Sequence, residues 1–151
     1  VDLGIDPDGF GADFFMMVCV ETAAVIAQLG VETGRLPRRR DFETATWLTA
    51  MLGRRHSAVD VALARGRLQA LARKMARAFE GFDVLLTPTL GQPPIELGAL
   101  LPKGAEAFVQ EMVATLGLGF ILALPPVVRA TVNRVFTFMP FTPLANVTGQ
   151  P

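Results

Sequence analysis

The sequence is poor in the side chains from which most hydrolytic centres are built. Its 151 residues include one cysteine, one histidine and no tyrosine, and they contain one serine, Ser57, and two lysines, Lys74 and Lys103. Ser57 directly follows the single histidine, His56. Neighbouring side chains on a helix or strand point in different directions, so these two do not form a nucleophile–base pair. The sequence therefore argues against a self-contained serine hydrolase.

The single cysteine and the lack of ligand clusters also argue against disulfide, metal and phosphate-binding sites. Cys19 cannot form an internal disulfide, and it lies in the apolar run 14–20, where we expect a packed and inert thiol. No Cys, His or acidic residues cluster with the spacing of zinc ligands, and no phosphate-binding glycine loop is present. We expect neither a metal nor a cofactor.

Neither sign of charge is in excess, since 14 basic and 14 acidic residues give a net charge of zero. Such a chain has no overall field to attract nucleic acid. The first residues are acidic, whereas secretory signal peptides begin with basic residues. The uncharged and strongly apolar stretch 112–128 only reaches the lower limit for a membrane span and contains two glycines and two prolines. We expect a cytoplasmic protein with no nucleic-acid partner and no membrane partner.

Apolar residues are abundant, at 51% of the chain, and most follow a helical period. We predict helices over 12–29, 41–54 and 57–81, and a weaker helix over 105–116. Asp41 is the expected N-cap of the second helix, and the third begins with the capping-box pattern of Ser57 and Asp60. The first helix, with Gly30 as its expected stop, is apolar nearly all round. We therefore expect it to pack against protein outside these 151 residues.

Two short segments have the composition of strands. The apolar run 83–87 follows the third helix and ends at Pro88, which is typical of a buried strand in a parallel or mixed sheet. A second short strand is predicted over 134–139. A long loop and a bent apolar region fill 88–128, and a turn-rich segment follows from residue 140. These elements predict an α/β fold.

The basic residues are unevenly placed. Residues 35–77 carry eleven bases and three acids, whereas residues 1–34 carry six acids and no base. The bases on the third helix lie opposite its apolar stripe, so this basic face, within residues 65–77, is expected to contact water or a partner. A helical interaction module that binds an acidic partner or nucleic acid through this face is the alternative function.

Two places could line a substrate site. In open α/β sheets ligands bind beyond the carboxyl ends of the strands, which selects Thr87, Pro88 and Thr89 after the predicted strand. The second place is the turn 146–149, with Asn146, Thr148 and Gly149. An ordinary loop and an Asx-type turn are the alternative interpretations of these two segments.

The same two segments resemble the C-terminal part of amidase-signature enzymes. The resemblance rests on DVLLTPT at 83–89, QPP at 92–94, LG at 97–98, PFTP at 140–143 and NVTGQP at 146–151. It covers nearly the whole chain, although Ala145 stands where the family often has phenylalanine. It implies a mixed-sheet α/β/α fold and hydrolysis of carboxamide C–N bonds by a Ser-Ser-Lys triad. One serine cannot supply that triad, so no catalytic residue is assigned here.

The resemblance implies that residues 1–151 form the C-terminal portion of a single amidase domain. That portion would comprise a helical part (12–81), a buried strand (83–87), a long loop and apolar region (88–128) and a short strand with a turn (132–151). We expect a segment truncated at both ends and inactive alone. Its expected partners are a small-molecule amide, preferably apolar, and either the remainder of the amidase domain or an oligomeric partner. A second alternative is a peripheral membrane segment at 112–128.

Overall fold

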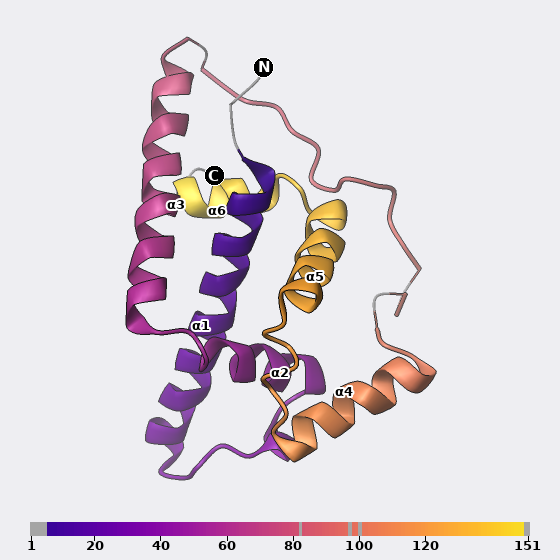
Figure 1. The fold of residues 1–151 in the computed structure, drawn as a ribbon. Helices are drawn as coiled ribbons and strands as arrows, with labels where there is room; N and C mark the ends of the chain where they lie inside the picture. Colours follow the sequence, from indigo (N-terminus) through magenta and orange to yellow (C-terminus); the bar gives the residue numbers. More distant parts are fainter. Residues whose placement is uncertain (1–5, 82, 97, 100, 150–151) are drawn as a thin grey trace.

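The computed structural model describes residues 6–81, 83–96, 98–99 and 101–149, and within these ranges the chain is helical, with no strand (Figure 1). This overturns the predicted α/β fold. The helices are α1 (Pro7–Thr33), η1 (Arg39–Asp41), α2 (Thr44–Gly53), α3 (Ala58–Ala78), η2 (Phe79–Gly81), α4 (Gly104–Leu116), α5 (Pro125–Phe138) and α6 (Thr142–Thr148).

Helix α1 is the central element and contacts α2, α3 and α5 (Figure 1). Its crossing with α2 is close: a Cβ added to Gly53 would lie 2.0 Å from the backbone oxygen of Cys19. Cys19 and Ala50 are completely buried near this crossing, and Ile26 is nearly so. Glycine at position 53 therefore allows the two backbones to approach, and the side chains near this crossing are closely packed.

Helix α4 packs on α2 through a small apolar cluster around Leu48, Val113 and Ala114. The hydroxyl of Thr44 donates a hydrogen bond to Glu111 at 2.8 Å, and the guanidinium of Arg39 forms an ion pair with the same carboxylate. These contacts, with the Thr44 hydrogen bond first, lower the pKa of Glu111. The start of α2 and the middle of α4 are thus joined by both apolar and polar contacts.

The predicted strand 83–87 is wrong, because this segment is extended but pairs with no other strand in the described chain. It is also not buried: Val84 is 79% exposed and Leu86 is 97% exposed. Its apolar composition is typical of a buried strand, but a strand forms only when a neighbouring strand satisfies its backbone groups. Phe82, which precedes it, lies outside the described residues.

The second predicted strand, 134–139, is also wrong, because most of it lies in α5. Pro125 and Pro126 occupy the first turn of this helix, where proline is well tolerated, so they begin a helix and do not bend a loop. Val132 is the buried residue of α5, and Phe136 follows one helical turn later to pack edge-on against Phe10. The β-branched and aromatic residues here follow a helical period, which determines the structure.

The predicted turn at 146–149 is likewise replaced by helix. Pro143 lies in the first turn of α6, and Gly149 ends the helix with a positive φ of 70°. The last two residues of the resemblance, Gln150 and Pro151, lie outside the described residues. Asn146 and Thr148 are therefore helical side chains and do not belong to a turn.

Of the signals expected to begin or end a helix, one is confirmed and two are wrong. The capping box at α3 is confirmed: the Ser57 hydroxyl accepts from the Asp60 N–H at 3.1 Å, and the Asp60 carboxylate accepts from the Ser57 N–H at 3.1 Å. Asp41 does not cap α2, which begins after Glu43, but accepts from the Arg38 N–H in the preceding 3₁₀ turn. Gly30 does not stop α1, which continues to Thr33.

One helix, at Gly9–Thr33, is long and apolar enough to cross a membrane, and 17% of its most apolar window is buried. Core helices of soluble proteins, which are mostly buried, and signal sequences near an N-terminus pass the same test of length and composition. Within this stretch Asp13 is buried and ion-paired with Arg67 of α3.

Candidate functional site

The two segments that carry the resemblance meet in one groove. Helix α3 packs on α6, and residues of the extended segment 83–87 line a groove of about 320 Å³ together with these two helices. We name it the motif groove. It is lined by Met75, Phe79, Asp83, Val84, Leu85, Thr87, Phe141, Leu144 and Ala145.

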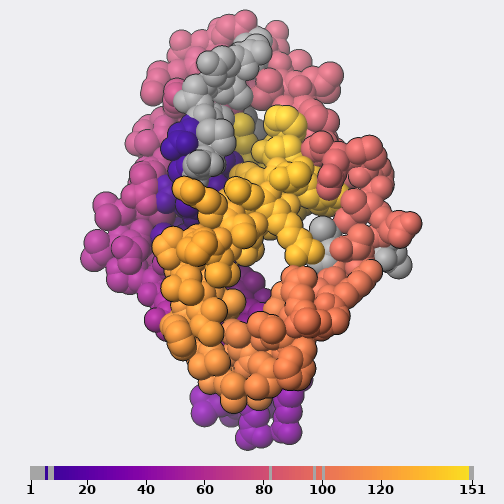
Figure 2. All heavy atoms as spheres, turned by 45° about the vertical axis from the view of Figure 1, so that its right-hand side comes forward, coloured from indigo at the N-terminus to yellow at the C-terminus, as the bar shows by residue number. Residues whose placement is uncertain are grey.

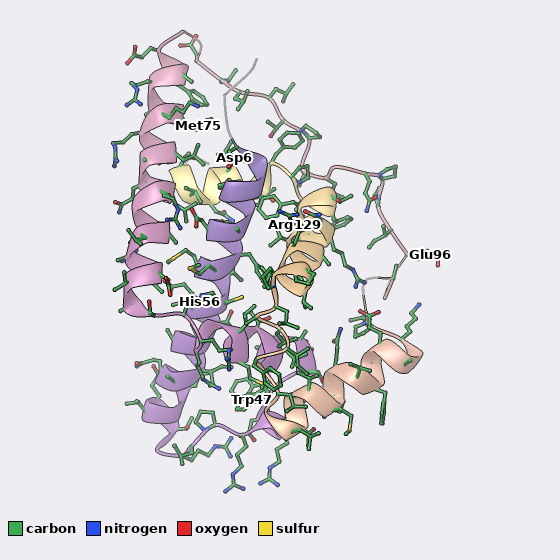
Figure 3. The ribbon with its side chains drawn as sticks, viewed as in Figure 1. Asp6, Trp47, His56, Met75, Glu96 and Arg129 are labelled. Carbon is green, nitrogen blue, oxygen red and sulfur yellow. The ribbon has the colours of Figure 1, made fainter. Side chains whose placement is uncertain are left out.

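The floor and rim of the motif groove differ in character. Met75 on α3, labelled in Figure 3, is almost completely buried and forms part of the apolar floor. Asp83 is the charged residue of the lining, and Thr87 adds a hydroxyl; both are exposed. An apolar floor with a few polar groups at its edge is typical of sites for small organic molecules.

The structure brings only one of the predicted site residues into this groove. Thr87 lines it, and the exposed Pro88 and Thr89 follow directly along the chain. This loop is attached to α5, since the Gly91 N–H donates to the backbone oxygen of Phe138 at 2.9 Å. The first candidate segment is thus held beside the C-terminal end of α5.

The second candidate segment lies just beyond the groove. Ala145 is the last lining residue of α6, and Asn146, Thr148 and Gly149 follow it. The Thr148 hydroxyl donates to the backbone oxygen of Leu144 at 3.0 Å, while Asn146 is exposed. The groove therefore joins the two segments through the start of α6 and not through these three residues.

The scarce reactive side chains do not converge on the groove. Ser57 is occupied as the cap of α3, and His56 lies in the preceding turn (Figure 3). Cys19 is completely buried, and this burial raises the pKa of its thiol to about 12. No group of three His, Cys, Asp or Glu side chains among the described residues could hold a metal ion.

The basic face of α3 is partly used inside the molecule. Nε and Nη2 of Arg67 donate to both carboxylate oxygens of the buried Asp13, at 2.7 and 2.6 Å, and these hydrogen bonds raise the pKa of Arg67. Arg65 lies 4.0 Å from Glu21 of α1. Arg67 therefore attaches α3 to α1. The side chains of Arg65 and Arg67 nevertheless stay 62% and 57% exposed, so the contact of this face with water or a partner stays a prediction.

Sequence reasoning missed the apolar residues of the motif groove as site residues. By their spacing Met75 and Phe79 belong to the apolar stripe of α3, and Phe141 and Leu144 fall in the segment predicted to be turn-rich. The spacing of four between Met75 and Phe79 carried a usable signal, because it places both on one helix face. That α6 would cover this face required the fold.

Comparison with known proteins gives one group of relatives. The protein named "Putative amidase AmiC" of Mycobacterium leprae is 28% identical over 149 residues, which are 96% of this chain and 26% of the relative. Proteins of the same name from Mycobacterium tuberculosis and Mycobacterium bovis are 28% identical over 130 residues, 83% of this chain and 23% of each relative.

The chain spans about a quarter of the length of these curated relatives. No family model matches the sequence, and no solved structure matches it significantly. The chain therefore has weak homology to proteins named as amidases, and this homology covers nearly all of the chain.

Proposed function

We propose that this chain is part of an amide hydrolase and contributes to its substrate site without supplying the catalytic residues. The observation that carries the proposal is the motif groove. Segments about 55 residues apart in sequence, both of which resemble amidase-signature enzymes, line one groove. The weak homology to the mycobacterial AmiC proteins supports the same class of reaction.

The reaction implied by the resemblance is nucleophilic acyl transfer. A serine, activated through a second serine and a neutral lysine, attacks the amide carbonyl; ammonia or an amine leaves, and water then releases the acid. With Ser57 used as a helix cap, these groups must come from polypeptide outside the present residues. In this proposal Thr87, Pro88 and Thr89 border the substrate, as do Asn146, Thr148 and Gly149 at the far end of α6.

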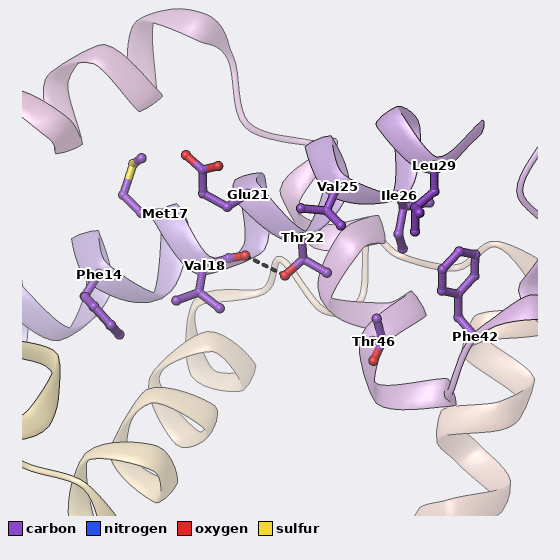
Figure 4. A pocket seen from close by; sticks show the side chains of 10 residues that line it. All are labelled: Phe14, Met17, Val18, Glu21, Thr22, Val25, Ile26, Leu29, Phe42 and Thr46. Carbon is purple, nitrogen blue, oxygen red and sulfur yellow. Dashed lines mark hydrogen bonds between the residues drawn. The ribbon is translucent and has the colours of Figure 1, made fainter. Parts of the chain in front are cut away.

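The proposed partner is the remainder of the amide hydrolase, in a cytoplasmic enzyme. A second groove, of about 640 Å³, runs along α1 and is almost entirely apolar (Figure 4). Phe14, Met17, Val25 and Leu29 line it, and the Thr22 hydroxyl is satisfied by the backbone oxygen of Val18 at 2.7 Å. Exposed apolar surface of this kind marks a contact with other protein, and here we assign that contact to the missing part of the enzyme.

Complementation tests the proposal. The chain is co-expressed with the part of the M. leprae AmiC protein that lies outside the matched residues, and ammonia release from hexanamide and from succinamic acid is measured. We expect the two polypeptides to copurify and to hydrolyse hexanamide faster than the charged amide, while each alone is inactive. Copurification without ammonia release from any amide would contradict the proposal.

A hydroxyl-deletion variant then tests the motif groove. Thr87→Val keeps the shape of the side chain and removes the hydroxyl that would hydrogen-bond to the substrate in this proposal, so we expect activity of the complex to fall about three- to tenfold. The matched control is Thr33→Val at the end of α1, whose hydroxyl bonds only to the backbone of Leu29. Equal activity of the two variants would show that the Thr87 hydroxyl does not contribute to substrate binding.

A further inference from the structure

A separate cavity of about 650 Å³ lies between α1, α2, α4 and α5 and shares no residue with the motif groove. Leu48 and Leu52 of α2, Val113 of α4, and Ile121 and Leu122 of the following turn give it an apolar wall. This volume is in the range of sites for small organic ligands. Figure 2 shows this side of the molecule hollowed between α4, in orange, and α5, in yellow-orange.

The edge of this cavity carries opposite charges. Arg134 of α5 and Glu106 of α4 both line it and form an ion pair at 3.4 Å, with their side chains 49% and 53% exposed. Gln110 also lines it and donates from Nε2 to the same Glu106 oxygen at 3.3 Å. The cavity therefore has an apolar interior and, at its solvent-facing edge, hydrogen-bond donors beside an acceptor.

This arrangement selects among ligands by their polar ends. A carboxylate would be attracted by Arg134 but repelled by Glu106. An ammonium group would be attracted by Glu106 but repelled by Arg134. An uncharged group that both donates and accepts a hydrogen bond can satisfy both side chains without breaking their ion pair. An aliphatic tail attached to it would occupy the apolar interior.

From this geometry we propose that the cavity binds one small uncharged amphiphile, with a head group that donates and accepts hydrogen bonds and an aliphatic tail of about eight carbons. The proposal does not depend on the chain's being part of an amide hydrolase, because it uses none of the motif-groove residues. Its test uses binding as the readout, so its failure is distinguishable from a failure of complementation.

The test is a titration of the ¹⁵N-labelled chain with 1-octanol, octanoate and octylammonium. We expect 1-octanol to shift amide signals of the cavity residues on α2, α4 and α5, with a dissociation constant on the order of 1 mM. Ala130→Phe fills the cavity from α5 and should weaken this binding at least about tenfold. Ala76→Phe, an exposed alanine of α3 outside the cavity, should leave it unchanged.

Two charge variants test the head-group argument. Glu106→Gln should raise octanoate affinity about threefold relative to 1-octanol, and Arg134→Gln should do the same for octylammonium, since exposed charges interact weakly. If 1-octanol shifts no amide signals of the cavity residues, the proposal is overturned, and this holds also where the cause is that the isolated chain does not fold. Equal binding by Ala130→Phe and Ala76→Phe overturns it too, as does any preference of the unaltered chain for either charged ligand.

Discussion

The crossing of α1 and α2 and the extended segment 83–87 are both rich in apolar residues. The apolar side chains at the crossing are buried, whereas most of those in the segment are exposed. At the crossing, Cys19 and Ala50 are fully buried, and a glycine allows contact between backbones. In the extended segment, Val84 and Leu86 stand in solvent. Apolar side chains gain free energy when they leave water, but they can be buried only where a neighbouring element lies close enough to cover them.

Thiol labelling should give the largest contrast between the two regions. At pH 8, the raised pKa of Cys19 makes its reactive thiolate about a thousandfold scarcer than that of an ordinary cysteine, and burial blocks access as well. In the variant Leu86→Cys, the new thiol stands in solvent. We expect one equivalent of a thiol reagent to react at once with that variant and none with the unaltered chain until urea is added.

Rapid reaction of the unaltered chain would contradict this expectation, because it would mean that the crossing opens readily in solution. A slow reaction of Leu86→Cys would mean instead that the extended segment is covered. The pattern of labelling therefore tests the two halves of the comparison independently.

Substitution of glycine should give the next largest effect. Gly53→Ala places a methyl group against the backbone of Cys19, which flexible side chains cannot relieve, so we expect a loss of about 3 kcal/mol in the free energy of unfolding. Gly66→Ala is the matched control, because nothing lies within 4 Å of its added Cβ in the middle of α3. It should stabilise by about 0.5–1 kcal/mol. Urea unfolding followed by circular dichroism measures both, and equal midpoints would rule out the close crossing.

The comparison also separates what the sequence could predict from what it could not. Local signals were sufficient where they act within one or two turns: the apolar stripe and capping box of Ser57 and Asp60 predicted α3 correctly. The residues of 83–87 prefer a strand and predict one, but pairing depends on a second segment that residue composition does not specify. In α5 the proline pair was read as a bend, although proline also begins helices.

The candidate site was predictable to a smaller extent. The prediction for Thr87 depends on its place at the end of a strand, and Thr87 lies in the motif groove without that strand. Asn146 was chosen as a turn residue and is helical and exposed. The contact of α6 with α3, which creates the groove, links residues far apart in the chain and was not predictable from local patterns.

The cap of α3 should give a smaller, pH-dependent effect. Ser57→Ala removes an acceptor for the Asp60 N–H and should cost about 1 kcal/mol. Hydrogen bonds from the Ser57 hydroxyl and N–H lower the pKa of Asp60 below its ordinary value of 3.8. The stabilisation is thus fully present above that value and is lost as the pH falls through the lowered folded-state pKa. Asp60→Asn should abolish this part of the acid dependence, as followed by circular dichroism; an unchanged acid profile would contradict it.

The smallest effect is expected in the extended segment itself. Leu86→Ser removes a side chain that stands in solvent, so the free energy of unfolding should change by less than about 0.5 kcal/mol. Leu52→Ala, in the buried face of α2, should cost about 2–5 kcal/mol in the same urea experiment. If Leu86→Ser proved as costly as Leu52→Ala, the segment would be buried in solution. The contrast between this segment and the crossing of α1 and α2 would then be wrong.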